Sequence, residues 1–320
     1  MELNSKEKSA LFDEINRGIV SHAYIIEGAP GVGKRSFALA AAKAMLCTGG
    51  DKPCGVCSSC RKCDEGNHPD LHIFAPDGNT FKVDLVREIK RGVVLRPGEG
   101  DRSVYILQNA HAMTASAQNA LLKVFEEPPP GTVFLLLTEK REALLPTVRS
   151  RGRMIRLSAA DDGAVYEFLK ERFKGADENA LTEAVRMAEG SFGKAESVMK
   201  KEGRTERESA LKLCDKVFGD GSRYELYTAF LGQSRKRESL VQIIDCLTVA
   251  ARDALVTKLG CGNSTLLSPE QAVRFAAGRT ASSLYDIFEA LLECARSLRR
   301  NTDGGIALTE LCRRINQGKG

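Results

Sequence analysis

A glycine-rich loop near the N-terminus has the residues that bind phosphate. The stretch Gly28-Ala29-Pro30-Gly31-Val32-Gly33-Lys34 matches the GxxxxGK half of a Walker A motif and directly follows a short apolar run. Its glycines, Gly28, Gly31 and Gly33, allow backbone N–H groups to curl around phosphate oxygens at a helix N-terminus. Lys34 adds a positive charge. The sequence therefore predicts a P-loop domain.

The residue that should bind magnesium is absent from this loop. A Walker A motif continues with Ser or Thr, whose hydroxyl holds Mg²⁺, but Lys34 is followed by Arg35. Ser36 comes one residue late, about 100° further round the expected helix, and is a poor substitute. Whether the loop still binds ATP or ADP is left open, because Lys34 and the loop amides remain.

The acids that activate water are also absent. The apolar run Val104–Leu107 is the strand that should end in acidic residues, but it is followed by Gln108 and Asn109. Amides accept no proton at neutral pH, and a general base typically contributes about 10²- to 10⁴-fold in rate. We therefore expect no intrinsic ATP hydrolysis. The alternative is an NTPase that recruits a carboxylate from elsewhere, such as Glu126 or Glu127.

A crowded group of cysteines follows the first predicted helix and indicates a metal site. Its members are Cys47, Cys54, Cys57, Cys60 and Cys63. Zinc takes four tetrahedral ligands, and a CxxC turn can direct two sulfurs at one ion. Ferredoxins share the Cys-x2-Cys-x2-Cys spacing, but their fourth cysteine follows after three residues and precedes Pro. Structural zinc is favoured, with an iron–sulfur cluster or free thiols as alternatives.

Five other cysteines are scattered along the second half of the chain. We expect them to pack as small hydrophobic residues; they are Cys214, Cys246, Cys261, Cys294 and Cys312. His68 lies near the cysteine group and leads into a predicted strand, and we expect it to be a hydrogen-bonded structural residue rather than a ligand.

Length and composition indicate a globular protein of two or three domains. The chain has 320 residues, of which 42% are hydrophobic and 28% are charged. No apolar run approaches the roughly 18 residues of a membrane helix. The first eight residues are polar and charged where a secretory signal would be apolar, so we expect a cytoplasmic protein. The net charge of +5 is compatible with nucleic acid or acidic partners.

The elements that must position these residues change in type near position 157. Up to there, apolar runs alternate with helical patterns, which is typical of a parallel sheet covered by helices. The expected strands are 23–26, 71–74, 104–107, 133–137 and 154–157, and the expected helices are 36–46, 84–91 and 115–126. Every later segment that shows periodicity has helical spacing, first in a small region at 160–203 and then in longer helices.

In this order the motifs resemble the bacterial DNA polymerase III clamp-loader subunits, the gamma/tau and delta-prime family of AAA+ proteins. The resemblance rests on the cysteine insertion directly after the P-loop helix and on four stretches, His22–Gly28, His68–Asp70, Gln118–Pro129 and Leu145–Arg151. They fall between residues 22 and 157, and the helical remainder matches only in pattern. The resemblance implies a P-loop AAA+ domain (1–158) with a zinc knuckle at 47–63, a small helical lid (159–205) and an all-α collar (206–320).

The resemblance also implies roles for individual residues. The family's zinc ligands map onto Cys47, Cys54, Cys57 and Cys60, which leaves Cys63 as an extra, alternative ligand. Its Ser-Arg-Cys motif maps onto Ser150, Arg151 and Gly152, and the arginine acts on the ATP of a neighbouring subunit. Thr138 falls where family ATPases carry a polar sensor of the γ-phosphate.

An active motor needs both the magnesium-binding hydroxyl after Lys34 and the acids after Leu107, and this chain has neither. It therefore resembles the delta-prime type more than the gamma/tau motor. The implied function is a non-hydrolysing member of the polymerase III holoenzyme that supplies Arg151 in trans. The implied partners are gamma/tau-like ATPase and delta-like subunits and, through the complex, the sliding clamp and primer-template DNA. The alternatives are an active gamma/tau-like ATPase and a zinc-knuckle nucleic-acid-binding protein. The latter lacks the aromatic clustering expected of base-stacking proteins.

Overall fold

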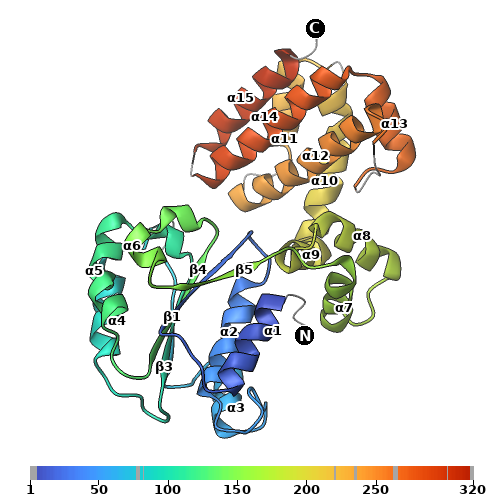
Figure 1. The fold of residues 1–320 in the computed structure, drawn as a ribbon. Coiled ribbons are helices and arrows are strands. Elements are labelled where there is room, and N and C mark those ends of the chain that lie inside the picture. The colour runs from blue at the N-terminus through green and yellow to red at the C-terminus, as the bar shows by residue number, and fades with distance from the viewer. Residues whose placement is uncertain are drawn as a thin grey trace. The chain divides into compact units, whose positions relative to one another are not determined.

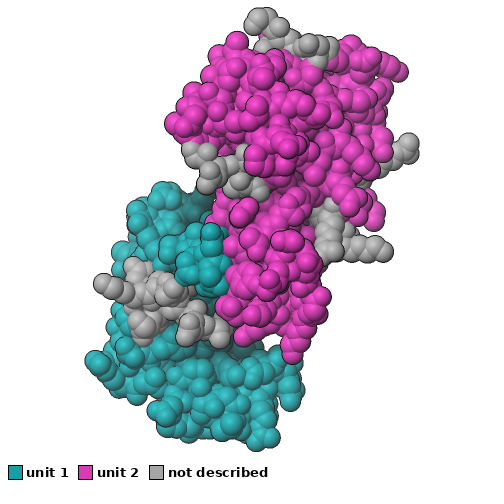
Figure 2. All heavy atoms as spheres, turned by 90° about the vertical axis from the view of Figure 1, so that its right-hand side faces the viewer, with its two compact units in different colours: residues 1–164, 190–193 teal, residues 165–189, 194–320 magenta. Residues whose placement is uncertain are grey.

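The chain forms two compact units. The computed structural model describes residues 6–76, 80–81, 83–219, 221–233, 236–261, 266–300 and 302–317. Unit 1 comprises residues 1–164 together with 190–193, and unit 2 comprises 165–189 and 194–320 (Figure 2). Among the described residues, no helix is both long enough and apolar enough to span a membrane.

Unit 1 is built on a five-stranded sheet with the order β2-β3-β4-β1-β5. Its strands are β1 (Ala23–Gly28), β2 (Leu71–Phe74), β3 (Ser103–Leu107), β4 (Thr132–Thr138) and β5 (Arg153–Leu157). Every pair is parallel. All residues of β3 and β4 are buried, as expected for central strands covered on both faces. The predicted parallel sheet is thereby confirmed.

Helices cover both faces of this sheet (Figure 1). The helices of this unit are α1 (Lys6–Asn16), α2 (Lys34–Leu46), α3 (Ser58–Glu65), α4 (Val83–Val93), α5 (Ala115–Glu126) and α6 (Pro146–Arg149), with 3₁₀ turns at Ala110–Ala112 and Arg141–Ala143, and α3 packs on α2 rather than on the sheet. Successive strand residues point to opposite faces. Tyr24 and Ile26 therefore pack with α1 and α2, whereas Ile25 packs with α4 and α5. The sequence reading missed α1, α3 and α6.

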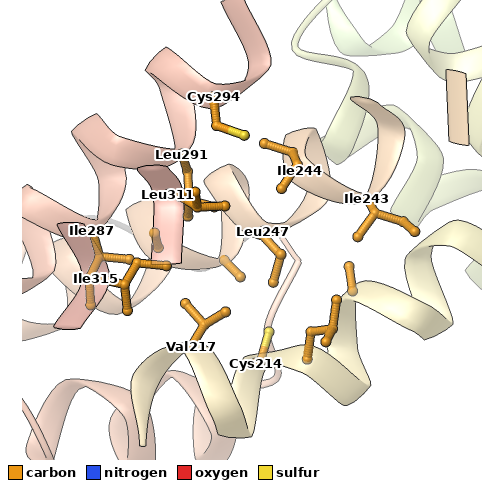
Figure 3. Close-up of a cluster of buried hydrophobic side chains, with 14 of the residues drawn as sticks. Cys214, Val217, Ile243, Ile244, Leu247, Ile287, Leu291, Cys294, Leu311 and Ile315 are labelled. Atoms are coloured by element: carbon orange, nitrogen blue, oxygen red, sulfur yellow. The ribbon is translucent and has the colours of Figure 1, made fainter. Parts of the chain in front are cut away.

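Beyond residue 157 the described residues form helices and connecting turns and no strand, as predicted, and these helices make up unit 2 except for the first residues of α7 and α9. They are α7 (Asp162–Arg172), α8 (Glu178–Ala188), α9 (Phe192–Met199), α10 (Lys201–Phe218), α11 (Arg223–Leu231), α12 (Arg237–Lys258), α13 (Pro269–Ala277), α14 (Ala281–Arg299) and α15 (Gly304–Gln317). Its core joins α10, α12, α14 and α15; Figure 3 shows Val217, Leu247, Leu291 and Leu311 converging there. The separate lid (159–205) and collar (206–320) stay a prediction, and α10 runs through their expected boundary.

The scattered cysteines are mostly core residues, as predicted, with one exception. Cys214, Cys294 and Cys312 are buried and Cys246 is partly buried, but Cys261 is exposed just after the end of α12. Burial raises the pKa of Cys214, Cys246 and Cys294 to about 12 each. These three thiols therefore stay protonated and unreactive at neutral pH.

Arg279 holds the C-terminal end of α10 from a buried position. Its Nε donates to the carbonyl oxygen of Phe218 at 2.9 Å and its Nη2 to that of Gly219 at 2.7 Å. These carbonyls are among those that a helix end leaves without an intrahelical partner. Replacement of Arg279 would leave the buried carbonyl of Phe218 and the partly buried carbonyl of Gly219 without this donor.

We expect Arg279→Met to lower the free energy of unfolding by about 2–4 kcal/mol, because buried hydrogen bonds to a charged donor are lost. Urea unfolding of the purified chain measures this. Arg274→Met is the matched control: Arg274 forms an exposed ion pair with Asp215, and such pairs contribute about 1 kcal/mol or less. Equal effects of the two substitutions would contradict the capping role of Arg279.

Candidate metal centre, phosphate loop and exposed arginine

Four cysteine sulfurs converge at one point beside α2 and α3. The Sγ atoms of Cys47, Cys54, Cys57 and Cys60 all lie within 4.8 Å of one another. The Sγ atoms of Cys47 and Cys57 are 3.9 Å apart, and those of Cys54 and Cys60 are 4.0 Å apart. Four tetrahedral sulfur ligands about 2.3 Å from a central ion lie roughly 3.8 Å from one another. The group therefore fits one metal ion and leaves little room for a cluster of several irons.

Backbone N–H groups surround these sulfurs because each Cys-x-x-Cys segment forms a tight turn. The amide of Cys57 donates to Cys54 Sγ at 3.4 Å, and the amide of Cys60 donates to Cys57 Sγ at 3.3 Å. The bond from Cys60 is the main reason that the pKa of Cys57 falls to about 5, whereas burial raises the pKa of Cys60 to about 12. A bound divalent cation would deprotonate the coordinating thiols outright.

Cys63 lies outside this group of four. It is half-buried against the core formed by α1, α2 and the sheet, and burial raises its pKa to about 11. The structure thus brings together the four cysteines that the resemblance assigns as ligands and separates the fifth from them.

His68 is a buried hydrogen-bonded residue, as predicted, and not a member of the sulfur group. Ser59 Oγ donates to the carbonyl oxygen of Leu46 at 2.7 Å, so it must accept the bond from His68 Nε2 at 2.9 Å. His68 Nδ1 accepts from the backbone N–H of Asp70 at 3.1 Å. In this arrangement Nε2 is the donor and Nδ1 the acceptor of the ring. The sequence reading missed Ser59, which connects α3 to the end of α2.

The phosphate loop connects β1 to α2, the context in which such loops bind phosphate. Gly31 and Gly33 have φ angles of 74° and 94°, which side chains other than glycine rarely adopt. Lys34 Nζ donates to the carbonyl oxygens of Gly28 at 2.7 Å and Ala29 at 2.9 Å. Burial lowers the pKa of Lys34. The lysine is therefore bound to its own loop.

A distant segment of the chain, residues 190–193, lies against this loop. The amide of Gly193 donates to the carbonyl oxygen of Gly31 at 3.0 Å, and Ser191 Oγ donates to that of Pro30 at 3.4 Å. A Cβ atom added at Gly193 would lie 3.0 Å from Gly31 Cα, so the two backbones approach closely. The sequence gives no signal for this contact.

The strand ends next to the loop carry polar groups that are already paired. Thr138 Oγ1, at the end of β4, donates to the carbonyl oxygen of Lys140 at 3.0 Å. Glu27, a carboxylate that sequence reasoning missed, lies opposite Thr138 in the sheet register. Its Oε2 accepts from Arg156 Nε at 3.1 Å. The carboxylate directly preceding the loop is thus engaged in an ion pair.

Arg151 lies at the opposite edge of the sheet from its own phosphate loop. It precedes β5, whereas the loop follows the end of β1, and these two strands are parallel neighbours. A five-residue strand such as β5 spans roughly 16 Å, which exceeds the reach of a side chain. Glu126 ends α5 and precedes β4, so it lies at the same edge as Arg151. Glu127, the C-cap of α5, lies on the same connection. The geometry therefore argues against both Glu126 and Glu127 as catalytic carboxylates for this chain's own loop.

The guanidinium of Arg151 has two short contacts and a longer one to Ser150 Oγ at 3.4 Å, while remaining partly exposed. Its Nη1 donates to the carbonyl oxygen of Thr147 at 2.8 Å, and its Nη2 lies 2.7 Å from Glu126 Oε1. The side chain is 33% exposed. The sequence reading gave no indication that Glu126 pairs with Arg151.

Comparisons with known proteins point to one family. Residues 3–161 match the family described as DNA polymerase III, delta subunit. The chain is 33% identical to the DNA polymerase III subunit delta' of Haemophilus influenzae over 250 residues, which cover 78% of this chain and 74% of that protein. It is 36% identical to the Bacillus subtilis subunit delta' over 172 residues, 53% of this chain and about half (52%) of that protein's length.

A solved structure shares the fold. The gamma subunit-related protein of Thermotoga maritima aligns with a TM-score of 0.50 and 19% identity, covering 98% of this chain and 100% of that one.

Proposed function

The chain belongs to the DNA polymerase III delta-prime family, and from this premise we propose that it is a clamp-loader subunit that completes a loader ring without hydrolysing ATP itself. Its partners would be gamma/tau-like ATPase subunits and a delta-like subunit in the cytoplasm. Through the assembled complex it would act on the sliding clamp and primer-template DNA.

The observation that carries the proposal is that the magnesium ligand and the water-activating acids of an ATPase are both missing. Arg35 occupies the position of the magnesium-binding hydroxyl, and β3 is followed by the amides Gln108 and Asn109. Lys34 would have to leave two backbone carbonyls before it could reach a phosphate. Binding and hydrolysis are therefore both disfavoured in this chain, and hydrolysis more so, because two separate parts of its chemistry are missing.

The position of Arg151 supports action on a neighbouring subunit. The sheet separates it from this chain's own loop, so a phosphate that it contacts must belong to another molecule. A guanidinium that is partly exposed and always charged can stabilise negative charge developing on such a phosphate. We therefore propose Arg151 as a trans arginine finger.

Structural zinc is the cofactor that best suits the four converging thiols. Four sulfur donors without an open position are typical of structural rather than catalytic zinc sites. Cys47, Cys54, Cys57 and Cys60 would hold the ion, and it would fix the segment between α2 and β2. In this proposal the four cysteines stabilise the fold of the segment and take no part in catalysis.

The isolated chain should hydrolyse ATP no faster than background, and Lys34→Ala should leave that rate unchanged. The reason is the loss of both the magnesium ligand and the water-activating acids. A phosphate-release assay with and without magnesium measures it. Steady turnover that Lys34→Ala abolishes would instead support the alternative of an active gamma/tau-like ATPase.

Partner identity is tested by purifying the tagged chain from its host. The proposal expects the clamp-loader ATPase to co-purify, with sliding clamp and polymerase subunits following at low salt. Recovery of nucleic acid without any of these proteins would favour the nucleic-acid-binding alternative. The same purification with a chain carrying Cys57→Ser and Cys60→Ser shows which partners still bind when the metal centre is lost. Partners that remain bound do not depend on the metal centre.

A further inference from the structure

An ion pair fixes the proposed finger from within its own subunit. Arg151 Nη2 lies 2.7 Å from Glu126 Oε1, and the two residues come from different connections of the sheet. We propose that Glu126 is a positioning residue, which orients the guanidinium of Arg151 before this guanidinium contacts the phosphate of a neighbouring subunit. This inference rests on the proposed trans action of Arg151.

The position of Glu126 is unfavourable for the helix that carries it. Glu126 is the last residue of α5, where the helix dipole is negative and a carboxylate is destabilising. The partial exposure of its side chain, 45%, means that water alone could solvate the charge. The helix end by itself therefore favours a cationic or neutral residue at this position. We attribute the presence of a carboxylate to its contact with Arg151.

The geometry leaves the finger able to bind phosphate while it is held. A guanidinium has five N–H donors. The contacts with Thr147, Ser150 and Glu126 use three of them at most. Anchoring at Nη1 and Nη2 restricts the long side chain to few rotamers, so less conformational entropy is lost when the remaining donors bind a phosphate.

The test uses the assembled clamp-loader complex with DNA and sliding clamp. Glu126→Gln removes the charge and keeps the shape, and it should lower kcat for ATP roughly three- to tenfold, the range that corresponds to ordering one long side chain. The KM for ATP and assembly should not change. Glu127→Gln is the matched control, because it removes the same charge from the exposed neighbouring residue and should leave kcat unchanged.

A double-mutant cycle distinguishes positioning from other roles. In an Arg151→Ala background, Glu126→Gln should have no further effect, because the residue that it positions is gone. An equal further loss in that background would overturn the inference, since Glu126 would then act independently of Arg151. A rise in kcat of Glu126→Gln would also overturn it, because the carboxylate would be a restraint on the finger.

Two outcomes distinguish the role of Glu126 from that of Arg151. If Arg151→Ala lowers turnover but Glu126→Gln behaves as the unaltered protein, positioning by Glu126 is wrong and the finger stands. If Arg151→Ala has no effect, the finger itself is wrong and the inference falls with it. Because exposed ion pairs contribute little to folding, the unfolding midpoint of Glu126→Gln should stay close to that of Glu127→Gln.

Discussion

Arg151→Ala should sharply reduce the DNA-stimulated ATPase and clamp loading of the assembled complex, while folding, metal content and assembly remain intact. Arginine fingers contribute about 10³- to 10⁵-fold in favourable GTPases. A ring with several ATP sites retains turnover at those that Arg151 does not contact, so the net loss should be smaller. Arg151→Lys should restore little, because a point charge lacks the planar fork of donors.

The control for this prediction is Arg153→Ala. Arg153 lies two residues further along, at the start of β5, and its guanidinium pairs with Glu14. The substitution removes the same charge from the same edge of the sheet without touching the proposed finger. If the two variants had comparable activities in the reconstituted complex, Arg151 would be an ordinary surface arginine and the proposed finger would be wrong.

Replacing Cys57 and Cys60 together by Ser should abolish binding of one zinc ion per chain and unfold the segment around α3. Apparent binding free energies of structural zinc in zinc-finger peptides are about 10–16 kcal/mol at pH 7, far more than such a segment gains from its own packing. Few residues of α3 are buried, namely Ser59 and Cys60. Elemental analysis and hydrogen exchange of the α3 amides measure the two effects.

The helical unit should keep its fold in this variant, because its core is formed by α10, α12, α14 and α15. Cys63→Ser is the matched control and should retain the zinc, since Cys63 lies outside the sulfur group. A metal-free protein whose α3 amides are as protected as those of the metal-loaded protein would contradict the prediction. If the purified protein contained iron and showed visible charge-transfer absorption, the four cysteines would hold an iron–sulfur cluster and not zinc.

The parallel sheet and its main helices could be predicted because their signals are local. Each strand is a short apolar run, and the run Pro128-Pro129-Pro130 ends α5 where the sequence predicts it, since proline cannot continue a helix. The eight-residue α3 was missed because it has few apolar residues to give a helical period. Its order depends on contacts of Ser59 and the cysteines with other segments.

The sequence by itself determined which chemical groups this protein offers, because residue types and short spacings decide it. Four clustered thiols, a phosphate loop without its hydroxyl and acids, and an arginine after Ser150 can be read from neighbouring positions.

Only the tertiary structure decided which of these groups meet. Ser191 contacts Pro30 across 161 positions, Glu126 meets Arg151 because two connections reach the same edge of the sheet, and Cys63 is left out of the sulfur group. Such contacts depend on how parallel strands are ordered and on which edge each connection reaches, and no spacing along the chain encodes that.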